Sequence, residues 1–334
     1  ISGTKTTETG TTGAYSSNLS GLIPATTYHY RAYATSSAGT SYGADYTFTT
    51  LAVAPTVVTT AATSVTGISA TLNGTVNANN SSTTVTFEYG LTASYGTSVA
   101  ATPATITGTI TTNASYALSG LVPNTIYHYR IVGVNAGGTS NGNDMTFTTS
   151  ALPPEVYPNS AFPVGATSAT LNGTIHPHNS STAVTFNFGT TTAYGTNYIA
   201  DQSPINGNSL VGVTYTVTGL TPNTVYWFNC HASNIAGTDD GGDVMFITSA
   251  IPPTVVTTAA TGVGATSATL NGTVNANNQS SSVIIEWGLT ASYGNTVTPS
   301  PSSVTGTTTT PVSYALAGLV NSTTYHYRVV ATNA

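Results

Sequence analysis

The sequence has very few charged side chains, and their scarcity excludes several classes of function. Only 4% of its 334 residues are charged, and the formal net charge at pH 7 is −6. The four basic residues are Lys5, Arg31, Arg130 and Arg328. Nucleic-acid binding needs clustered Lys and Arg side chains that displace counterions from phosphates, and a basic membrane-binding patch needs similar clusters. Both functions are therefore excluded.

Long apolar runs and cysteine pairs are also missing. No apolar run approaches the roughly 18 residues that a membrane span requires, so we expect no span in this segment. Cys230 is the single cysteine, which rules out an intrachain disulfide. Cytosolic proteins usually keep mixed charges on their surface. Here Thr, Ser, Asn and Gly must cover the surface instead, which is typical of secreted and cell-surface β-proteins, and we expect an extracellular location.

A motif that recurs four times organises the chain. In its second copy it begins at Leu121 and reads Leu-Val-Pro-Asn-Thr-Ile-Tyr-His-Tyr-Arg. Its first tyrosine recurs every 99 residues, at Tyr28, Tyr127, Tyr226 and Tyr325. Self-similarity at a fixed period is the signature of a repeat architecture. This register predicts a partial repeat (a C-terminal half) at 1–50, a complete repeat at 51–149, a complete divergent repeat at 150–248, and a partial repeat lacking its last strand at 249–334.

The incomplete first and last repeats have two interpretations. The chain is either a slice of a longer array, or a subunit whose incomplete ends are completed by neighbouring subunits through strand donation. The two partial repeats overlap in the region they cover, so joining them would duplicate strands. This overlap favours the slice.

The repeats alternate apolar and polar residues with a period of two, as β-strands do. Residues 69–76 and 85–89 both follow this pattern, and no segment shows a helical period. Short alternating strands that fill about 100 residues, separated by Gly, Asn, Pro and Ser clusters, indicate a two-sheet sandwich. Short Pro-bearing junctions, such as 149–154, favour a semi-rigid linear array over independent beads. The predicted fold is therefore all-β, with tandem antiparallel β-sandwich domains.

The recurring motif resembles the C-terminal half of a fibronectin type III domain, in the variant common in large bacterial surface proteins. The resemblance rests on Leu-x-Pro-x-Thr-x-Tyr-x-x-Arg, a following Gly-x-Asn-x-x-Gly, and a Thr-Phe-Thr-Thr strand. It implies a tyrosine corner at Tyr28, Tyr127, Tyr226 and Tyr325. The family usually has a Trp two residues after the strand-B Leu, where this chain has Gly74, Gly173 and Gly272. We expect aromatic side chains such as Phe87, Tyr89 and Tyr129 to fill that volume.

Two pairs of opposite charges covary between repeats. Glu88 occurs with Arg130 and Glu286 occurs with Arg328, whereas the third repeat has Asn at both positions. If these positions lie on neighbouring strands, the side chains form outward cross-strand pairs. An exposed pair contributes at most about 1 kcal/mol, so the pairing is a structural prediction and not a site.

The third repeat carries the weak candidates for a metal site. His176 and His178 are two residues apart, and the aspartates of the 239–243 loop are potential Ca²⁺ ligands. These aspartates are Asp239, Asp240 and Asp243. The Asp spacing lacks the regular alternation of a calcium loop, and two histidines rarely make a site. We therefore expect no metal, no cofactor and no catalytic residue.

Other candidate residues have structural interpretations. His29, His128 and His326 recur without a neighbouring nucleophile, so we expect them to pack outward against a strand or domain. Cys230 aligns with Ile131 and is expected to be a buried thiol. Asn-x-Ser/Thr sequons, for example at Asn80 and Asn113, permit glycosylation but are expected by chance in this composition.

These features predict a non-enzymatic structural protein. The leading hypothesis is a semi-rigid spacer within an extracellular fibre, filament or adhesin stalk on a bacterial cell surface. Its poorly charged sheet edges make self-association into fibres plausible. One alternative is a spacer or carbohydrate-binding accessory region of a secreted polysaccharide-degrading enzyme. Another is recognition of carbohydrate or a surface protein by loops of the divergent third repeat.

Overall fold

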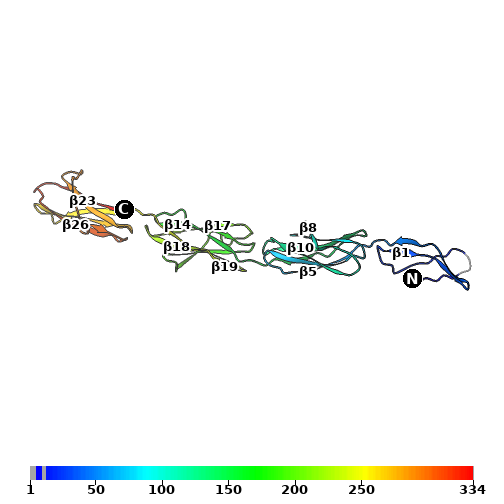
Figure 1. The fold of residues 1–334 in the computed structure, drawn as a ribbon. Coiled ribbons are helices and arrows are strands. Elements are labelled where there is room, and N and C mark those ends of the chain that lie inside the picture. Colours follow the sequence, from blue (N-terminus) through cyan, green and yellow to red (C-terminus); the bar gives the residue numbers. More distant parts are fainter. Residues whose placement is uncertain (1–4, 10–12, 334) are drawn as a thin grey trace. The chain divides into compact units, whose positions relative to one another are not determined.

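The computed structural model describes residues 5–9 and 13–333, and every regular element in this part of the chain is a β-strand (Figure 1). The chain divides into two compact units, Ile1–Leu152 and Pro153–Ala334. Within the described residues, no helix meets the length and hydrophobicity needed to cross a membrane. Each unit contains one partial and one complete repeat.

The described residues of the first repeat form two nested, antiparallel strand pairs. Strand β1 (Thr27–Tyr30) pairs with β4 (Tyr46–Thr49), and β2 (Tyr33–Ser36) pairs with β3 (Gly39–Tyr42). In β1 and β4, Phe48 stacks on the ring of Tyr28, with centroids 5.7 Å apart. The first repeat therefore contributes the F–G hairpin of a sandwich.

The second repeat is a complete antiparallel sandwich. Its strands are β5 (Thr56–Thr63), β6 (Ser69–Asn77), β7 (Thr83–Gly90), β8 (Thr97–Ile106), β9 (Thr112–Ser119), β10 (Ile126–Asn135), β11 (Gly138–Asn141) and β12 (Met145–Thr148). One sheet has the order β5-β6-β9, and the other has β8-β7-β10 with β11 and β12 both paired to β10. A single bridge between Thr102 and Ser115 joins the sheets at one edge. In the strand lettering of a fibronectin type III-like sandwich, the first sheet is A-B-E and the second is C′-C-F-G. Strands β11 and β12 together form G.

The period-two pattern of the sequence corresponds directly to burial. Along β6, Ala70, Leu72 and Val76 are at most 2% exposed and Gly74 is also buried, while the residues that alternate with them are partly exposed. Successive side chains of a strand point to opposite faces, so each sheet turns its apolar face inward. The antiparallel β-sandwich predicted from the sequence is confirmed, with the three-plus-four strand arrangement of a fibronectin type III-like domain.

The third repeat has the same two-sheet arrangement. Its strands are β13 (Glu155–Asn159), β14 (Ser168–His176), β15 (Ala183–Gly189), β16 (Thr196–Ile199), β17 (Val211–Thr218), β18 (Val225–Asn234), β19 (Gly237–Asp240) and β20 (Val244–Ile247). The sheets are β13-β14-β17 and β16-β15-β18, with β19 and β20 paired to β18.

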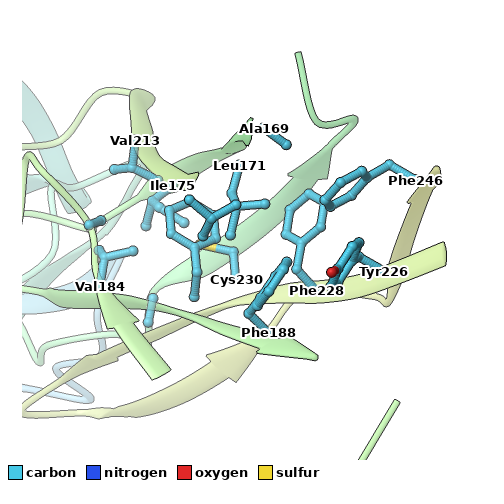
Figure 2. Close-up of a cluster of buried hydrophobic side chains, with 14 of the residues drawn as sticks. Ala169, Leu171, Ile175, Val184, Phe188, Val213, Tyr226, Phe228, Cys230 and Phe246 are labelled. Atoms are coloured by element: carbon cyan, nitrogen blue, oxygen red, sulfur yellow. The ribbon is translucent and has the colours of Figure 1, made fainter. Parts of the chain in front are cut away.

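The core of the third repeat is rich in aromatic rings (Figure 2). The ring of Phe188 stacks on Tyr226, with centroids 5.2 Å apart, and Phe246 stacks on Tyr226 at 5.7 Å. Leu171 and Ile175 of the facing sheet are fully buried against these rings. Such stacked rings contribute about 0.5–1.5 kcal/mol beyond the area they bury.

The fourth repeat lacks a closing strand among the described residues. Its strands are β21 (Thr254–Thr261), β22 (Ser267–Asn275), β23 (Ser281–Gly288), β24 (Asn295–Val297), β25 (Ser303–Val304), β26 (Thr310–Ala317) and β27 (His326–Asn333). Strand β27 pairs with β23 alone in this part of the chain, and it starts two residues later in the repeat than β10 does. A hollow of about 350 Å³ lies beside Trp287, Tyr325 and Tyr327.

The glycines at the family's tryptophan position are filled differently from the sequence-based expectation. A Cβ added to Gly74 would lie 2.7 Å from Cδ1 of Ile131 and 2.9 Å from the carbonyl oxygen of Val58. The corresponding neighbours are Cys230 at Gly173 and Val329 at Gly272. The expectation that aromatic rings fill this volume was therefore wrong, because a mid-sized side chain of strand F lies over each glycine.

Candidate functional site: the joint between repeats

The site begins with the tyrosine corner that the sequence predicted. In each repeat, the tyrosine hydroxyl accepts a hydrogen bond from the backbone N–H five residues earlier. The pairs are Ile23 to Tyr28 (2.8 Å), Val122 to Tyr127 (3.0 Å), Thr221 to Tyr226 (3.0 Å) and Val320 to Tyr325 (3.1 Å). The corner fixes the loop that precedes strand F, which is one side of the joint.

This E–F loop exposes an ordered pair of acceptors. In the first repeat, the Thr26 hydroxyl donates to the carbonyl of Pro24 at 2.9 Å. The backbone N–H of Thr26 donates to the Thr50 hydroxyl at 3.0 Å. Contacts within the first repeat therefore hold the carbonyl oxygen of Pro24 and the hydroxyl oxygen of Thr26 side by side.

The other side of the joint is a left-handed asparagine turn between strands B and C. Asn79 and Asn80 of the second repeat have φ values of 49° and 62°. Asparagine tolerates this region better than most side chains because its short amide bonds locally to the backbone. The side chain of Asn77 supports the turn by accepting the N–H of Asn79 at 3.0 Å. The turn therefore projects the Asn80 side chain outward from the end of the sandwich.

Asn80 bridges the first and second repeats, both of which lie in the first unit. Its side-chain Nδ2 donates to the Pro24 carbonyl at 3.0 Å and to the Thr26 hydroxyl at 2.8 Å. One amide group thus satisfies both acceptors of the preceding E–F loop. A pair of bonds from one planar group fixes direction as well as distance.

The third and fourth repeats, both in the second unit, form the same joint. Asn278 Nδ2 donates to the Pro222 carbonyl at 2.9 Å and to the Thr224 hydroxyl at 2.8 Å. A reciprocal bond runs from Asn223 Nδ2 to the Asn278 carbonyl at 3.1 Å. The joint is therefore a recurring feature of the chain and not a single contact.

The linker within each joint is also fixed to the repeat that follows it. In the first joint, Asn79 Nδ2 donates to the Ala54 carbonyl at 2.6 Å, and Asn135 Nδ2 donates to the Val53 carbonyl at 3.0 Å. A Cβ on Gly137 would lie 2.3 Å from the carbonyl carbon of Val53, so this glycine permits the close approach. Backbone groups of the linker are thereby satisfied without water.

The second joint repeats this arrangement. Asn277 Nδ2 donates to the Pro252 carbonyl at 2.6 Å, and Asn333 Nδ2 donates to the Ile251 carbonyl at 2.9 Å. Pro restricts the backbone on either side of its own ring. Side-chain bonds and Pro restriction together leave the linker few free torsions.

This role of the asparagines is not predicted from the sequence. There, Asn80 is only part of a possible glycosylation sequon, and no contact is assigned to the B–C loop. A signal was present, because Val-Asn-Ala-Asn-Asn occurs at 76–80 and again at 274–278. An identical loop in two repeats indicates a shared contact, but only the fold reveals that the partner lies 56 residues earlier.

The structure brings the predicted charge pairs together. Arg130 Nε lies 2.7 Å from Glu88 Oε2, and Arg328 Nε lies 2.6 Å from Glu286 Oε2. Each pair joins strands C and F in direct register. In the third repeat, Asn187 Nδ2 donates to Asn229 Oδ1 at 2.9 Å at the same register position.

Two of the recurring histidines, His29 and His128, have carboxylate partners that the sequence did not predict. His128 Nδ1 lies 2.8 Å from Asp144 Oδ2, and His29 Nδ1 lies 2.8 Å from Asp45 Oδ2. The Tyr95 hydroxyl donates to the other oxygen of Asp144 at 3.0 Å. Burial, followed by the bond to Asp144, raises the pKa of Tyr95 and keeps its hydroxyl a donor.

The weak metal candidates each have separate partners. The rings of His176 and His178 have centroids 4.2 Å apart and are tilted by 42° to each other, and His178 Nδ1 lies 2.7 Å from the Pro153 carbonyl. Burial, then the neighbouring His178, lowers the pKa of His176. No group of three or more His, Cys, Asp or Glu side chains that could hold a metal ion occurs in the described residues.

The aspartates of the 239–243 loop are dispersed in the same way. Asp239 accepts the N–H of Val156 at 2.7 Å, and Asp240 Oδ1 lies 2.7 Å from His231 Nδ1. Asp243 accepts the Tyr194 hydroxyl, which burial and this bond keep protonated by raising the Tyr194 pKa. Asp239 bonds to β13, Asp240 to β18 and Asp243 to the turn between β15 and β16, so the three carboxylates have separate partners.

Comparison with known proteins finds similarity to solved structures only. No protein-family model and no curated protein sequence matches this chain. A crystal structure of the FN1–FN3 domains of chicken CNTN1 is similar, with 17% identity and a TM-score of 0.35, covering 84% of this chain and 94% of that one. A crystal structure of titin domains is similar with 14% identity and a TM-score of 0.32, with the same coverage of each chain.

Proposed function

We propose that this chain is a non-catalytic, semi-rigid structural spacer in an extracellular fibre, filament or adhesin stalk of a bacterial cell surface. The observation that carries the proposal is the repeated asparagine joint, in which Asn80 and Asn278 each link a B–C loop to the preceding E–F loop. A spacer keeps its two ends at a fixed distance only if the joints between its repeats resist bending. Tandem sandwiches with fixed joints meet that requirement.

The composition supports an extracellular setting. Uncharged polar residues cover the surface, and only four basic residues offer cleavage points to Lys- and Arg-directed proteases. The sandwich cores bury enough apolar surface to need no disulfides, and Cys230 is fully buried. These properties suit a protein that stays folded outside the cell.

The proposal extends to lateral self-association through the third repeat. Strand β20 is an edge strand in which Met245 and Ile247 are 50% and 52% exposed. The second repeat has Thr146 and Thr148 at the same positions. Apolar side chains on an uncharged edge favour pairing with another copy of the chain.

The rigidity of the joint is tested by measuring distances across it. Spin labels at Thr192→Cys and Ala291→Cys, both exposed in equivalent turns, report on the third and fourth repeats in a chain that also carries Cys230→Val. Pulsed dipolar spectroscopy is expected to give one narrow distance distribution. Asn278→Gly preserves the left-handed turn but removes the amide, and is expected to broaden the distribution.

A matched control is Asn113→Gly, which alters an exposed asparagine of β9 far from that joint in the chain. Its distribution should equal that of the parent. A parent distribution as broad as that of a flexible linker would show that the chain is not a rigid spacer.

A further inference from the structure

A strained tyrosine recurs in the turn between strands C and C′ of three repeats. Tyr95, Tyr194 and Tyr293 have φ values of 59°, 54° and 58°. A bulky side chain is strained in this region, and glycine would adopt the same conformation without strain. All three repeats nevertheless place a ring here, so the ring has a role that offsets the strain.

The local packing shows how the tyrosine is held. A Cβ on Gly90 would lie 1.7 Å from the Tyr95 carbonyl oxygen, so the turn folds directly back onto strand C. The Tyr95 hydroxyl reaches Asp144 at 3.0 Å, and the Arg130 guanidinium carbon lies 4.8 Å from the ring centroid. The ring is therefore fixed on the outer face of the C′-C-F-G sheet.

An open hollow of about 410 Å³ lies beside this ring. Glu88, Tyr95 and Arg130 line it, and the rest of its wall comes from small residues of the turn, among them Ser94, Gly96 and Ser98. An aromatic ring and two planar polar groups thus face the same space. The small turn residues leave this space unfilled.

The chemistry of the three side chains suits a sugar ring. A guanidinium group has five N–H donors, and Arg130 uses its Nε on Glu88 Oε2. The remaining guanidinium donors and the carboxylate acceptors can bond adjacent hydroxyl groups. The face of a tyrosine ring packs against the C–H groups of a pyranose, since an amphipathic ring provides large contact area at low conformational cost.

Local charge favours a neutral ligand over an anion. The charges of Glu88 and Arg130 cancel, and Asp144 adds a negative charge nearby. The whole chain has a net charge of −6. A phosphate, sulfate or uronate would be repelled, whereas a hydroxyl-rich neutral polymer would not.

The arrangement recurs at a regular spacing along the chain. In the fourth repeat, Arg328 bonds Glu286 at 2.6 Å, and its guanidinium carbon lies 4.8 Å from the Tyr293 ring centroid. In the third repeat, Asn187 and Asn229 replace the charged pair and bond each other at 2.9 Å, and Asn229 is buried, so we restrict the site to the second and fourth repeats. Equivalent sites at a fixed repeat let weak individual contacts add up on a polymer.

We propose that the hollow formed by Glu88, Tyr95 and Arg130 binds neutral polysaccharide, and that the equivalent cluster of Glu286, Tyr293 and Arg328 does the same. This inference is independent of the spacer function, because a rigid spacer need bind no sugar and a flexible chain could still bind one.

Native affinity electrophoresis tests the proposal with hydroxyethyl cellulose, guar galactomannan and dextran in the gel, and alginate as a polyanionic probe. At least one of the neutral polymers is expected to retard the full chain. The double variant Arg130→Met with Arg328→Met is expected to bind about tenfold more weakly, the effect of losing a charged hydrogen bond. Exposed ion pairs add little stability, so this variant should fold, as circular dichroism can verify.

Two further variants separate binding from structure. Arg31→Met removes the same charge from the first repeat, outside the hollow and its equivalent cluster, and should be retarded like the parent. Tyr95→Gly with Tyr293→Gly removes the rings while relieving the strained turns, and should lose retardation. The proposal is overturned if none of the three neutral polymers retards the chain, if only alginate does, or if the arginine or tyrosine variants bind as the parent does.

Discussion

Asn278 Nδ2 lies 2.9 Å from the carbonyl oxygen of Pro222, which belongs to the preceding repeat and stands 56 residues earlier in the chain. The same separation connects Asn80 to Pro24 in the first unit. The side-chain amide of one residue with a left-handed backbone conformation thus links two repeats that share no β-sheet. The predictions below begin with this contact.

Two substitutions at Asn278 distinguish the contribution of the left-handed turn from that of the hydrogen bonds across the joint. Asn278→Ala should destabilise the fourth repeat more than Asn278→Gly, because alanine at a φ of 69° adds about 1–2 kcal/mol of strain that glycine avoids. Both variants lose the hydrogen bonds to Pro222 and Thr224. Urea unfolding measures the difference, and equal unfolding midpoints would contradict the role assigned to the left-handed turn.

The tyrosine corner should be sensitive to loss of one oxygen atom. Tyr127→Phe leaves the backbone N–H of Val122 without its 3.0 Å acceptor. An unsatisfied, partly buried N–H costs about 1–3 kcal/mol, so the free energy of unfolding of the second repeat should fall by that amount. Tyr116→Phe, on half-buried β9, is the control and should change little. A corner variant as stable as this control would argue against a structural role for the hydroxyl.

Gly74 should not tolerate a methyl group. The added Cβ of Gly74→Ala would lie 2.7 Å from Ile131 Cδ1 and 2.9 Å from the Val58 carbonyl oxygen, so backbone must shift. Overpacking of this kind costs about 1–3 kcal/mol. Gly212→Ala, also in a strand but with nothing within 4 Å of the new Cβ, should be neutral or slightly stabilising. Thermal melts of both variants measure the contrast.

Cys230 should be inert while the chain is folded. Burial raises the pKa of its thiol from 9.0 to about 12, so the reactive thiolate is scarce at pH 8. A thiol reagent such as dithionitrobenzoate should react only after unfolding in urea, and reaction with folded protein would disprove the burial.

The same pKa shift predicts a loss of stability at high pH. The folded state holds the proton more tightly than the unfolded state, so the contribution is complete below pH 9 and declines as pH rises towards 12. Cys230→Val removes the group, and its stability should change less than that of the parent across this interval. Identical pH profiles of the two chains would contradict the prediction.

The apolar edge of β20 should drive association of copies. Met245→Thr with Ile247→Thr gives the edge the residues of the second repeat, and should shift the sedimentation distribution towards monomer. The control, Leu210→Thr, removes a side chain that is 58% exposed in the same repeat but not on this edge. A distribution that is monomeric in the parent, or unchanged in the double variant, would eliminate association through β20.

The sequence alone determined the fold class, because alternation with a period of two sorts side chains between two faces without reference to distant contacts. The fixed spacing of Tyr28, Tyr127 and their equivalents revealed the repeats, and the covariation of Glu88 with Arg130 indicated neighbouring strands. Each inference relies on a local pattern or on repetition, and both can be read from the sequence without a structure.

Tertiary structure alone decided what these patterns leave open. Gly74 lies under Ile131 and not under an aromatic ring, because the packing of two sheets depends on their stagger, which no local pattern encodes. His128 pairs with Asp144, and Asn80 reaches Pro24, because chain reversals bring residues 16 and 56 positions apart together. The joint and the hollow beside Tyr95 both arise from such long-range contacts, so they became visible only in the folded chain.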